Sequence, residues 1–322
     1  MSNRVALVTG ANKGIGFAIV RALCKKFDGD VILTARNVDL GKKAVSQLEQ
    51  EGLTPKFHQL DLLDRASIER TKSFLQSEYG GLDVLVNNAG VAYKVAATEP
   101  FAEQAEVSVR VNFRGTLDVC EVLFPLLRDH ARVVHVSSMG SKMAIDRCSD
   151  DVKRRVKSAS EQSTTDSIEK LLDEFVQAAK SGKHQELGWA NTAYGMSKIG
   201  VTVSAIIQQG QFNKDSRKDL VVNACCPGYV ATDMSSFKGH KTIDEGADTP
   251  VYLALLPPAS DSPKGEFVSD RQIKTFWATL DICKESAEWL ESCVCSVAPS
   301  LHYKPLIDRD FVKTGENPRL RA

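Results

Sequence analysis

An excess of charge of either sign is absent from this sequence. Its 322 residues include 41 basic and 41 acidic side chains, so no whole-chain field attracts it to nucleic acid or to a membrane surface. No apolar run reaches the length that a membrane span requires. The first apolar run begins at Val5, which leaves no room for a signal peptide. We therefore expect neither nucleic acid nor a membrane among the partners.

Cysteine pairs at metal-binding spacing are also lacking. The eight cysteines are irregularly spaced, and Cys293-Val-Cys295 has no second pair at the distance that zinc sites use. Cys24, Cys120 and Cys225 lie in apolar surroundings, where cysteine behaves as a small hydrophobic residue. The sequence therefore predicts no metal site, and it favours a reduced protein of the cytoplasm.

What the sequence does contain is a strand, a glycine turn and a helix at its beginning. The run Val5–Val8 suits a strand that is buried on both faces, and helical spacing of apolar residues starts at Ile15. Between them, Gly10 allows a sharp turn, Gly14 allows close approach to a pyrophosphate, and Gly16 allows the helix to pack on the strand. The helix N-terminus also favours a phosphate. This stretch predicts a dinucleotide site.

Two cations indicate which dinucleotide binds. NAD-preferring units carry an acidic residue just after the second strand, where it binds the ribose 2′-hydroxyl. Here that strand, residues 31–35, ends at Arg36, and Lys13 lies within the glycine turn. Two cations near the 2′ position favour a phosphate, so NADP(H) is the expected cofactor. The alternative is that both are ordinary surface charges.

The rest of the chain alternates strands with helices. Apolar runs predict strands at 57–60, 84–86, 132–136 and 220–225, with a short last strand at 265–269. Apolar spacing and capping signals predict helices at 40–48, 64–79, 103–129 and 194–211, and one from Thr242 to the prolines at 257 and 258. This alternation predicts an α/β fold with a doubly wound parallel sheet, the Rossmann fold, whose ligand lies at the carboxyl edge.

An insertion, residues 139–187, interrupts this pattern. Its segment 166–179 has an apolar stripe, a cap-like start at Asp166 and Glu169, and Gly182 after its end. We expect one amphipathic helix docked on a single domain. The members of the stripe are Ile168, Leu171, Leu172, Phe175 and Ala179. If the stripe covers the neighbouring helix face, the protein is a monomer; the alternative is that it forms a new dimer contact.

Tyr194 and Lys198 stand four apart at a helix start, so both point the same way. A tyrosine titrates near 10, but a nearby ammonium lowers its pKa and makes it a usable acid. Asn112 is a poor helix former inside a predicted helix, which indicates a specific partner or a solvated side chain. His135 lies within a strand, which favours a packed core histidine.

The order of these motifs resembles the classical short-chain dehydrogenase/reductase family. The motifs are Thr9-Gly-x-x-x-Gly-x-Gly, Asn87-Asn-Ala-Gly90, Asn112, Ser137-Ser138, Tyr194-x-x-x-Lys198 and Pro227-Gly228, and the resemblance extends over residues 4–277. Residues 278–322 lie beyond it and are predicted to be a disordered extension that catalysis does not require. The long insertion, Gly188-Trp189 before Tyr194, and Cys225-Cys226-Pro227-Gly228 look like the monomeric NADPH-dependent carbonyl reductases.

The resemblance implies a catalytic tetrad. Tyr194 would be the general acid, Ser138 would hydrogen-bond the substrate oxygen, Lys198 would bind the nicotinamide ribose, and Asn112 would hold a water. Adjacent serines cannot be separated by sequence alone, and Ser138 is chosen over Ser137 from the family pattern. The NADPH contacts expected from the motifs and the resemblance are Gly10, Asn12, Lys13, Gly14, Ile15, Gly16, Arg36, Asp61, Leu62, Asn88, Ala89, Gly90, Tyr194, Lys198, Pro227, Gly228, Val230 and Thr232.

The resemblance also implies the substrates: ketones, aldehydes and quinones, reduced by hydride transfer. It further implies a contact with glutathione or its adducts. Substrate-side residues would be Ser138, Tyr93, Lys94, Val95, Gln104, Trp189 and Ala193. Cys226, beside the Pro-Gly turn, is either a reactive thiol or an inert packed one. Alternative functions are a dedicated steroid or prostaglandin dehydrogenase and a non-catalytic NADPH-binding sensor or scaffold.

Overall fold

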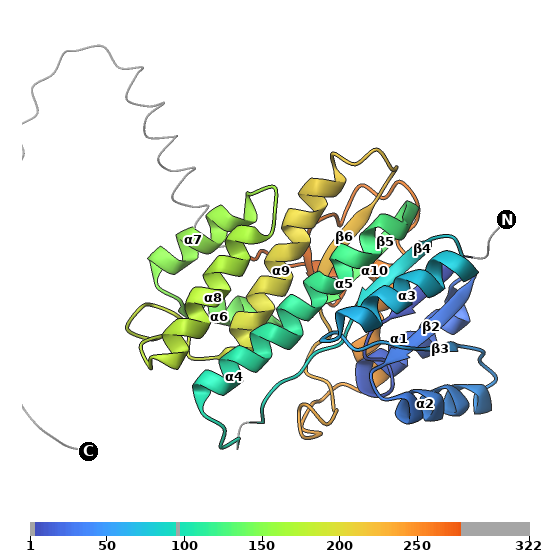
Figure 1. Cartoon of the computed structure of the whole chain (residues 1–322), viewed down its shortest axis with the longest axis horizontal. Helices are drawn as coiled ribbons and strands as arrows, with labels where there is room; N and C mark the ends of the chain where they lie inside the picture. Colours follow the sequence, from blue (N-terminus) through green and yellow to red (C-terminus); the bar gives the residue numbers. More distant parts are fainter. Residues whose placement is uncertain (1–3, 95–96, 278–322) are drawn as a thin grey trace, which may run out of the picture. The chain divides into compact units, whose positions relative to one another are not determined.

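The apolar runs of the sequence form the strands of one sheet, and helices α3, α5 and α9 lie across it in the view of Figure 1. The computed structural model describes residues 4–94 and 97–277. Met1–Phe276 form one compact unit. The predicted extension, residues 278–322, lies outside the described residues, and the domain boundary at 277 stays a prediction. No helix of the described part is long and apolar enough to cross a membrane.

The sheet has eight strands in the order β3-β2-β1-β4-β5-β6-β7-β8. The first seven are parallel to their neighbours, and β8 pairs antiparallel with β7. Their bounds are β1 Val5–Val8, β2 Asp30–Ala35, β3 Lys56–Gln59, β4 Leu82–Asn87, β5 Leu127–Val136, β6 Val221–Cys226, β7 Phe267–Ser269 and β8 Gln272–Ile273. The predicted doubly wound parallel sheet is confirmed, while β8 was not predicted because it is two exposed residues long.

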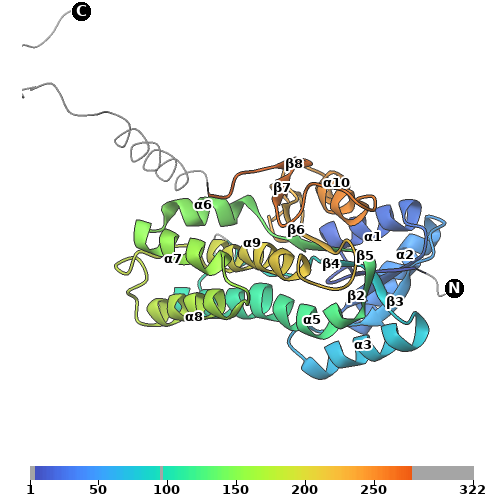
Figure 2. The same ribbon diagram turned by 90° about the horizontal axis from the view of Figure 1, so that it is seen from above.

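Helices cover both faces of this sheet (Figure 2). On one face lie α1 Gly14–Lys26, α2 Val38–Gln50 and α10 Ile243–Ala254; on the other lie α3 Arg65–Glu78, α4 Phe101–Ser108, α5 Gly115–Leu123 and α9 Ala193–Phe212. The capping box predicted at Thr242 is present, with Glu245 at its third helical position. Because the strands are buried on both faces, this is the expected parallel arrangement.

The predicted helix 103–129 is wrong in its interior and at its end. A π-helical turn, Val109–Arg114, separates α4 from α5, and a 3₁₀ turn, Phe124–Leu126, ends the run. Pro125 has no N–H for an α-helical hydrogen bond, so the helix cannot continue there. Consequently β5 starts at Leu127, five residues before the predicted strand.

The insertion contains three helices instead of the one expected. They are α6 Met139–Arg147, α7 Asp150–Ser160 and α8 Asp166–Lys180. The predicted cap is also wrong: Asp166 is the first helical residue of α8, and Thr165 precedes it with no side-chain cap bond. The apolar stripe of α8 is buried as expected, and α8 packs against α4 and α9. A Cβ added at Gly200 of α9 would lie 2.5 Å from Leu172, so glycine permits this close approach.

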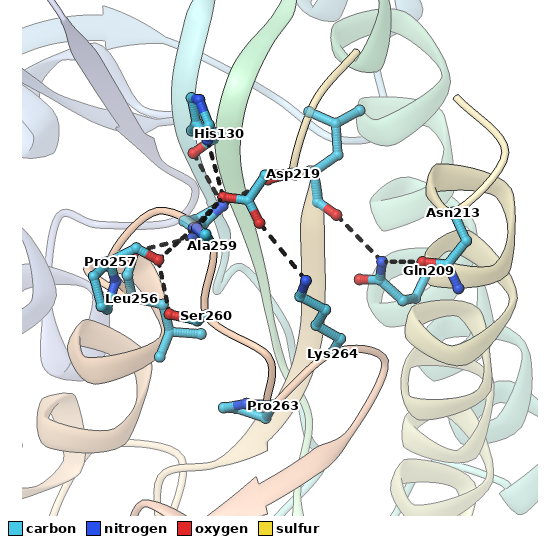
Figure 3. Close-up of polar contacts among 12 residues, drawn as sticks. His130, Gln209, Asn213, Asp219, Leu256, Pro257, Ala259, Ser260, Pro263 and Lys264 are labelled. Atoms are coloured by element: carbon cyan, nitrogen blue, oxygen red, sulfur yellow. Dashed lines mark hydrogen bonds and ion pairs between the residues drawn. The ribbon is translucent and has the colours of Figure 1, made fainter. Parts of the chain in front are cut away.

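Helix α9 is fixed to the sheet by a side-chain amide. The Gln209 Oε1 accepts from the Val222 N–H at 2.9 Å, and its Nε2 donates to the Leu220 carbonyl at 3.2 Å and to Asn213 Oδ1 at 2.9 Å. The amide thus satisfies backbone groups on either side of the start of β6 (Figure 3). This bond sets the position of the helix that carries Tyr194 and Lys198.

A buried arginine joins three elements at the amino edge of the sheet. The Arg132 side chain is 3 % exposed, and its guanidinium donates to the carbonyls of Leu256 at 3.0 Å, Pro257 at 2.7 Å and Asp219 at 2.7 Å. It also pairs with the Asp219 carboxylate at 2.9 Å. The planar fork of arginine suits such a multidentate role, and it holds the end of α10 against β5 and β6.

Asp219 is the centre of that cluster (Figure 3). Besides Arg132, its carboxylate contacts His130 Nδ1 at 3.0 Å, the Ala259 N–H at 2.9 Å and Lys264 Nζ at 3.8 Å. Burial opposes ionisation, but the bonds from His130, Ala259 and Arg132 hold the pKa of Asp219 well below its usual range. The amino edge is therefore closed by a dense polar network, opposite the edge where ligands of this fold bind.

Candidate active site

The glycine turn is braced by the end of β4. The Thr9 hydroxyl accepts from the backbone N–H groups of Asn88 and Ala89, each at 3.0 Å. In return, the Asn88 side chain donates to the carbonyls of Thr9 at 3.0 Å and Gly10 at 3.1 Å. Gly10 has φ +61°, and a Cβ there would lie 2.8 Å from Ala89. The two motifs predicted to lie at the cofactor are therefore in contact, and only glycine permits the approach.

The N-terminus of α1 has the features of a phosphate site. Its cap residue, Lys13, makes no side-chain cap bond, and the first turn contains no acidic residue. The backbone N–H groups and the positive end of the helix dipole are thus available to an anion. The Ala11 N–H donates to the Thr34 carbonyl at 2.8 Å, which ties the turn to the end of β2. Arg36, exposed, comes directly after that strand. These features fit NADP(H).

Asp61 and Leu62 follow β3 at the same edge. The Leu60 N–H donates to the Ala35 carbonyl at 3.1 Å, so this segment runs beside the end of β2. The Asp61 carboxylate accepts from the Leu63 N–H at 3.0 Å, which holds the turn. Leu62 is 8 % exposed. Their predicted place beside the adenine stays a prediction.

Asn112 has the specific partners that its position in a helix indicated. It lies in the π-helical turn, is fully buried, and receives the Val91 N–H on Oδ1 at 2.7 Å. Its Nδ2 donates to the Val91 carbonyl and to the Ser197 hydroxyl, both at 2.9 Å. A Cβ added at Gly90 would lie 3.1 Å from Asn112 Oδ1 and 3.4 Å from Lys198 Nζ. Asn112 and Lys198 therefore line the same small space.

The structure separates the two adjacent serines. The Ser137 hydroxyl is buried and bonded to the Lys198 carbonyl at 3.1 Å and to Thr202 at 2.7 Å. The Ser138 hydroxyl caps α6 by accepting from the Gly140 N–H at 3.0 Å. A Cβ added at Gly140 would lie 3.2 Å from Ser138 Oγ and 3.6 Å from Tyr194 Cε1, so this hydroxyl and the Tyr194 ring face the same small space. Ser138 is thus the serine that faces the predicted acid, whereas Ser137 has its bonding capacity filled inside the protein.

Burial dominates the ionisation of Tyr194 and Lys198. It raises the pKa of Tyr194 to about 12, although the Ser138 hydrogen bond acts in the opposite direction. It lowers the pKa of Lys198 to about 8. Lys198 Nζ donates to the Val136 carbonyl at 2.7 Å and lies 5.8 Å from the Tyr194 ring centre. The expected lowering of the Tyr194 pKa by this ammonium is not seen, because burial raises the pKa and Lys198 is not among the causes of the shift.

The segment after β6 continues along the carboxyl edge. Pro227 is buried, and Gly228 has φ +87°. Val230 is 4 % exposed, and a Cβ at Gly14 would lie 3.5 Å from Thr232, which places this segment over the glycine turn. Cys226 is 4 % exposed. Its sulfur accepts from the Gly228 N–H at 3.3 Å, which favours the packed-thiol interpretation.

The expected substrate-side residues do not form one group. Tyr93 donates to Glu103 at 3.4 Å. Lys94 is exposed, and Gln104 donates to the Glu99 carbonyl at 2.9 Å. Trp189 and Ala193 are 4 % and 6 % exposed, and Trp189 packs against Phe175 of α8. Those two side chains therefore belong to the core. Val95 lies outside the described residues.

His135 is a core residue, as predicted. It is fully buried, with Nδ1 3.1 Å from Asn87 Nδ2 and Nε2 2.7 Å from Gln208 Oε1. Burial lowers its pKa to about 4. No cluster of three or more possible metal ligands occurs within residues 4–94 and 97–277.

Sequence reasoning missed Thr9, Ser197 and Thr202 as supporting residues of the site. Each bonds a residue of a recognised motif: Thr9 holds Asn88, Ser197 holds Asn112, and Thr202 holds Ser137. The signal for Ser197 was its place between Tyr194 and Lys198 on a helix face that the sheet buries. Thr9 is the first residue of the glycine motif, but its role as a hydrogen-bond acceptor was not predicted, and Thr202 carries no signal beyond its residue type.

The comparisons with known proteins agree with this geometry. A family model described as short chain dehydrogenase matches residues 4–149. The chain is 52 % identical over 271 residues to carbonyl reductase [NADPH] 1 of Rattus norvegicus, covering 84 % of this chain and 97 % of the rat protein. The chain therefore belongs to the short-chain dehydrogenase/reductase family.

Two further relatives show how far the likeness extends. Carbonyl reductase [NADPH] 1 of Homo sapiens is 52 % identical over 271 residues, covering 84 % of this chain and 97 % of that protein. Among solved structures, salutaridine reductase from Papaver somniferum has a TM-score of 0.74 at 30 % identity, covering 83 % of this chain and 99 % of that one. The fold and its insertion are thus matched nearly end to end by reductases.

The pKa of Lys198 predicts a pH-dependent stability. Between about pH 8 and 10.5 the unfolded lysine holds a proton that the native one has lost, so this residue makes stability rise with pH across that window. The contribution is complete above 10.5 and is lost as the pH falls through 8. Urea unfolding of cofactor-free wild type and Lys198→Met should therefore give a stability difference that shifts in favour of wild type from pH 8 to 10.5. A constant difference would contradict the burial of this charge.

Proposed function

We propose that this chain is an NADPH-dependent carbonyl reductase that converts ketones, aldehydes and quinones into alcohols or hydroquinones. The observation that carries the proposal is the placing of Ser138 beside the Tyr194 ring at the carboxyl edge, with Lys198 one helical turn away. The same edge holds the glycine turn and its free helix N-terminus. Binding a dinucleotide and protonating a nearby oxygen are the two tasks that this arrangement supports.

NADPH, when bound, supplies the hydride that the carbonyl carbon accepts. Tyr194 then acts as the general acid and gives its phenolic proton to the carbonyl oxygen. The Ser138 hydroxyl, which lies beside the Tyr194 ring, donates a hydrogen bond to the same oxygen and orients it. Both side chains are fixed before substrate arrives, because Ser138 caps α6 and Tyr194 lies in the first turn of α9.

Lys198 and Asn112 prepare the site for proton transfer. With a pKa of about 8, Lys198 is mostly an ammonium at neutral pH, and its field favours the phenolate that Tyr194 becomes. Its proposed contact with the nicotinamide ribose uses the donor positions that the Val136 carbonyl leaves free. Asn112, fixed on Val91 and Ser197, would hold a water next to Lys198.

The exposed apolar side chains near this pair favour apolar carbonyl compounds. Met139 and Met143 lie on α6, which begins directly after Ser138, and are 37 % and 51 % exposed. Tyr229 and Met234, on the segment after β6, are 49 % and 44 % exposed. Large exposed apolar groups on two segments of a ligand edge are typical of a binding site. A dedicated steroid or prostaglandin dehydrogenase would use the same groups, and a substrate panel separates the two.

A non-catalytic sensor remains the alternative of another class. Such a protein needs the glycine turn, but it has no use for an acid at the position of the accepting carbonyl. The placing of Ser138 against Tyr194 supports the enzyme. For glutathione, only Tyr93, Lys94 and Gln104 are retained as proposed contacts, because Ala193 and Trp189 are buried.

The insertion supports a monomer. The family resemblance implies that classical members form dimers through two helices, which correspond to the α4–α5 segment and to α9. Here α8, a helix of the same chain, packs against α4 and α9, and its apolar stripe is buried. The residues that the structure describes include five cysteines, all free, which is typical of a reducing compartment. We therefore propose a cytoplasmic monomer.

Replacement of Tyr194 tests the acid. Tyr194→Phe keeps the ring and removes the proton, so reduction of menadione should fall by roughly 10²–10⁴, while NADPH binding stays near wild type. Loss of NADPH absorbance gives the rate, and fluorescence titration gives the binding. Tyr252→Phe, on α10, is the matched control and should retain full activity. Near-normal turnover of Tyr194→Phe would remove the tetrad assignment.

Replacement of Arg36 tests the cofactor contact. A charge-assisted hydrogen bond contributes about 1.5–3 kcal/mol, so Arg36→Ala should raise the KM for NADPH at least about tenfold and leave that for NADH nearly unchanged. Arg154→Ala, an exposed arginine of α7, controls for the loss of one positive charge. Equal weakening of both cofactors would show that Arg36 does not contact the 2′-phosphate.

The mass in solution tests the monomer. Light scattering of the purified chain should give a mass near 35.2 kDa at all concentrations tested, because α8 covers the contact helices. A stable mass of twice or four times that value would show that the stripe or another face joins subunits.

A further inference from the structure

An ion pair connects the glycine turn to the segment after β6. Lys13 Nζ lies 2.6 Å from Asp233 Oδ2, although the two residues are 220 positions apart. Their side chains are 67 % and 56 % exposed. The preceding residue, Thr232, lies over Gly14, at 3.5 Å from where a Cβ there would be. The carboxylate is thus held directly beside the N-terminus of α1.

Asp233 is a carboxylate with two lysines, Lys13 and Lys94, near it. The hydrogen bond and charge of Lys13, together with the charge of Lys94, lower the pKa of Asp233, so it is ionised at neutral pH. The first turn of α1 has no acidic residue of its own. The negative charge nearest to the phosphate-binding turn is therefore supplied by another part of the chain.

This inference rests on the proposed function, in which Arg36 contacts the 2′-phosphate of NADPH, and on the expectation from the sequence that Lys13 is the second cation there. The carboxylate of Asp233 and that phosphate need the same ammonium. We propose that Asp233 is a specificity-determining residue that competes with the cofactor 2′-phosphate for Lys13. It pairs with Lys13 when no cofactor is bound and lowers the affinity for phosphorylated dinucleotide, which eases release of the oxidised cofactor.

The segment after β6 has other contacts that fix its position, so a substitution of Asp233 should remove the carboxylate without displacing the segment. Val230 pairs with Lys241 as a β-bridge, and the Ala231 N–H donates to the Lys241 carbonyl at 2.8 Å. Lys241 also pairs with Asp270 at 2.5 Å, and the Ser235 hydroxyl donates to the Val230 carbonyl at 2.6 Å. Removing the Asp233 carboxylate leaves these contacts in place.

The test measures binding without catalysis. Calorimetric titration with adenosine 2′,5′-bisphosphate should give Asp233→Asn an affinity about two- to fivefold above wild type, the range that an exposed ion pair supports. The gain should shrink in high salt, because exposed charges are screened. Binding of 5′-ADP, which lacks the 2′-phosphate, should not change. Asp150→Asn, which removes an exposed carboxylate paired with Lys153 on α7, is the matched control and should bind both probes as wild type does.

A double-mutant cycle shows whether Asp233 acts through Lys13. Lys13→Met should weaken binding of the bisphosphate, and adding Asp233→Asn to it should then give little further change. If Lys13→Met weakens binding but Asp233→Asn leaves it unchanged or weakens it, the competition is overturned while the proposed cofactor contact stands. If Lys13→Met has no effect on the bisphosphate, the Lys13 contact itself is wrong, and the competition falls with it. Melting temperatures of all variants confirm that each is folded.

Discussion

The buried ammonium of Lys198 is the constraint on which most of this structure depends. The residue is 4 % exposed, and its Nζ has a backbone carbonyl, that of Val136, within 2.7 Å. Burying a charge is unfavourable unless polar groups surround it. The helix that carries it must therefore start at the carboxyl edge, where backbone carbonyls end their strands. Gly90 lies against the same space, where an added Cβ would be 3.1 Å from Asn112 Oδ1, a tight contact, and 3.4 Å from the ammonium.

The burial of the Lys198 ammonium requires that α9, the helix that carries it, is itself largely buried. Sixteen of its twenty residues are buried, since the helix touches β6 on one side and α4, α6 and α8 on others. Helix α8 supplies an apolar face that would otherwise be missing, and the Gln209 amide fastens the far end to β6. The insertion thus contributes to the packing of the helix that carries Tyr194 and Lys198 of the proposed tetrad.

Local patterns were sufficient to predict most of the sheet and the main motifs. Val5–Val8 and Val84–Val86 are apolar because both faces of a parallel sheet are covered, and the glycine turn has the spacing that a dinucleotide site requires. The π-helical turn at Val109–Arg114 has no such signal, because it accompanies the bonds between Asn112 and Val91. Helix α7 was missed because its sequence is mostly charged and contains only two valines, Val152 and Val156, both of which are buried.

The same division applies to the site. Residue type and spacing identified Tyr194, Lys198 and Asn112, yet they could not tell Ser137 from Ser138. That choice depends on long-range contacts, because the Ser137 hydroxyl is hydrogen-bonded to Thr202 and to the Lys198 carbonyl. The family resemblance implied that Trp189 lies on the substrate side; its ring packs on Phe175 in the insertion, and a substrate contact stays a prediction. Long-range partners such as Asp233 are visible only after the chain has folded.

The insertion also has a consequence for inheritance. Every residue proposed for catalysis is contributed by the same polypeptide, and α8 covers faces of α4 and α9 from within that polypeptide. In the proposed monomer, a polypeptide damaged by mutation has no partner subunits whose activity it could impair. A cell with one defective allele would keep the full activity of each molecule made from the other. Total activity should therefore fall in proportion to gene dose and no further.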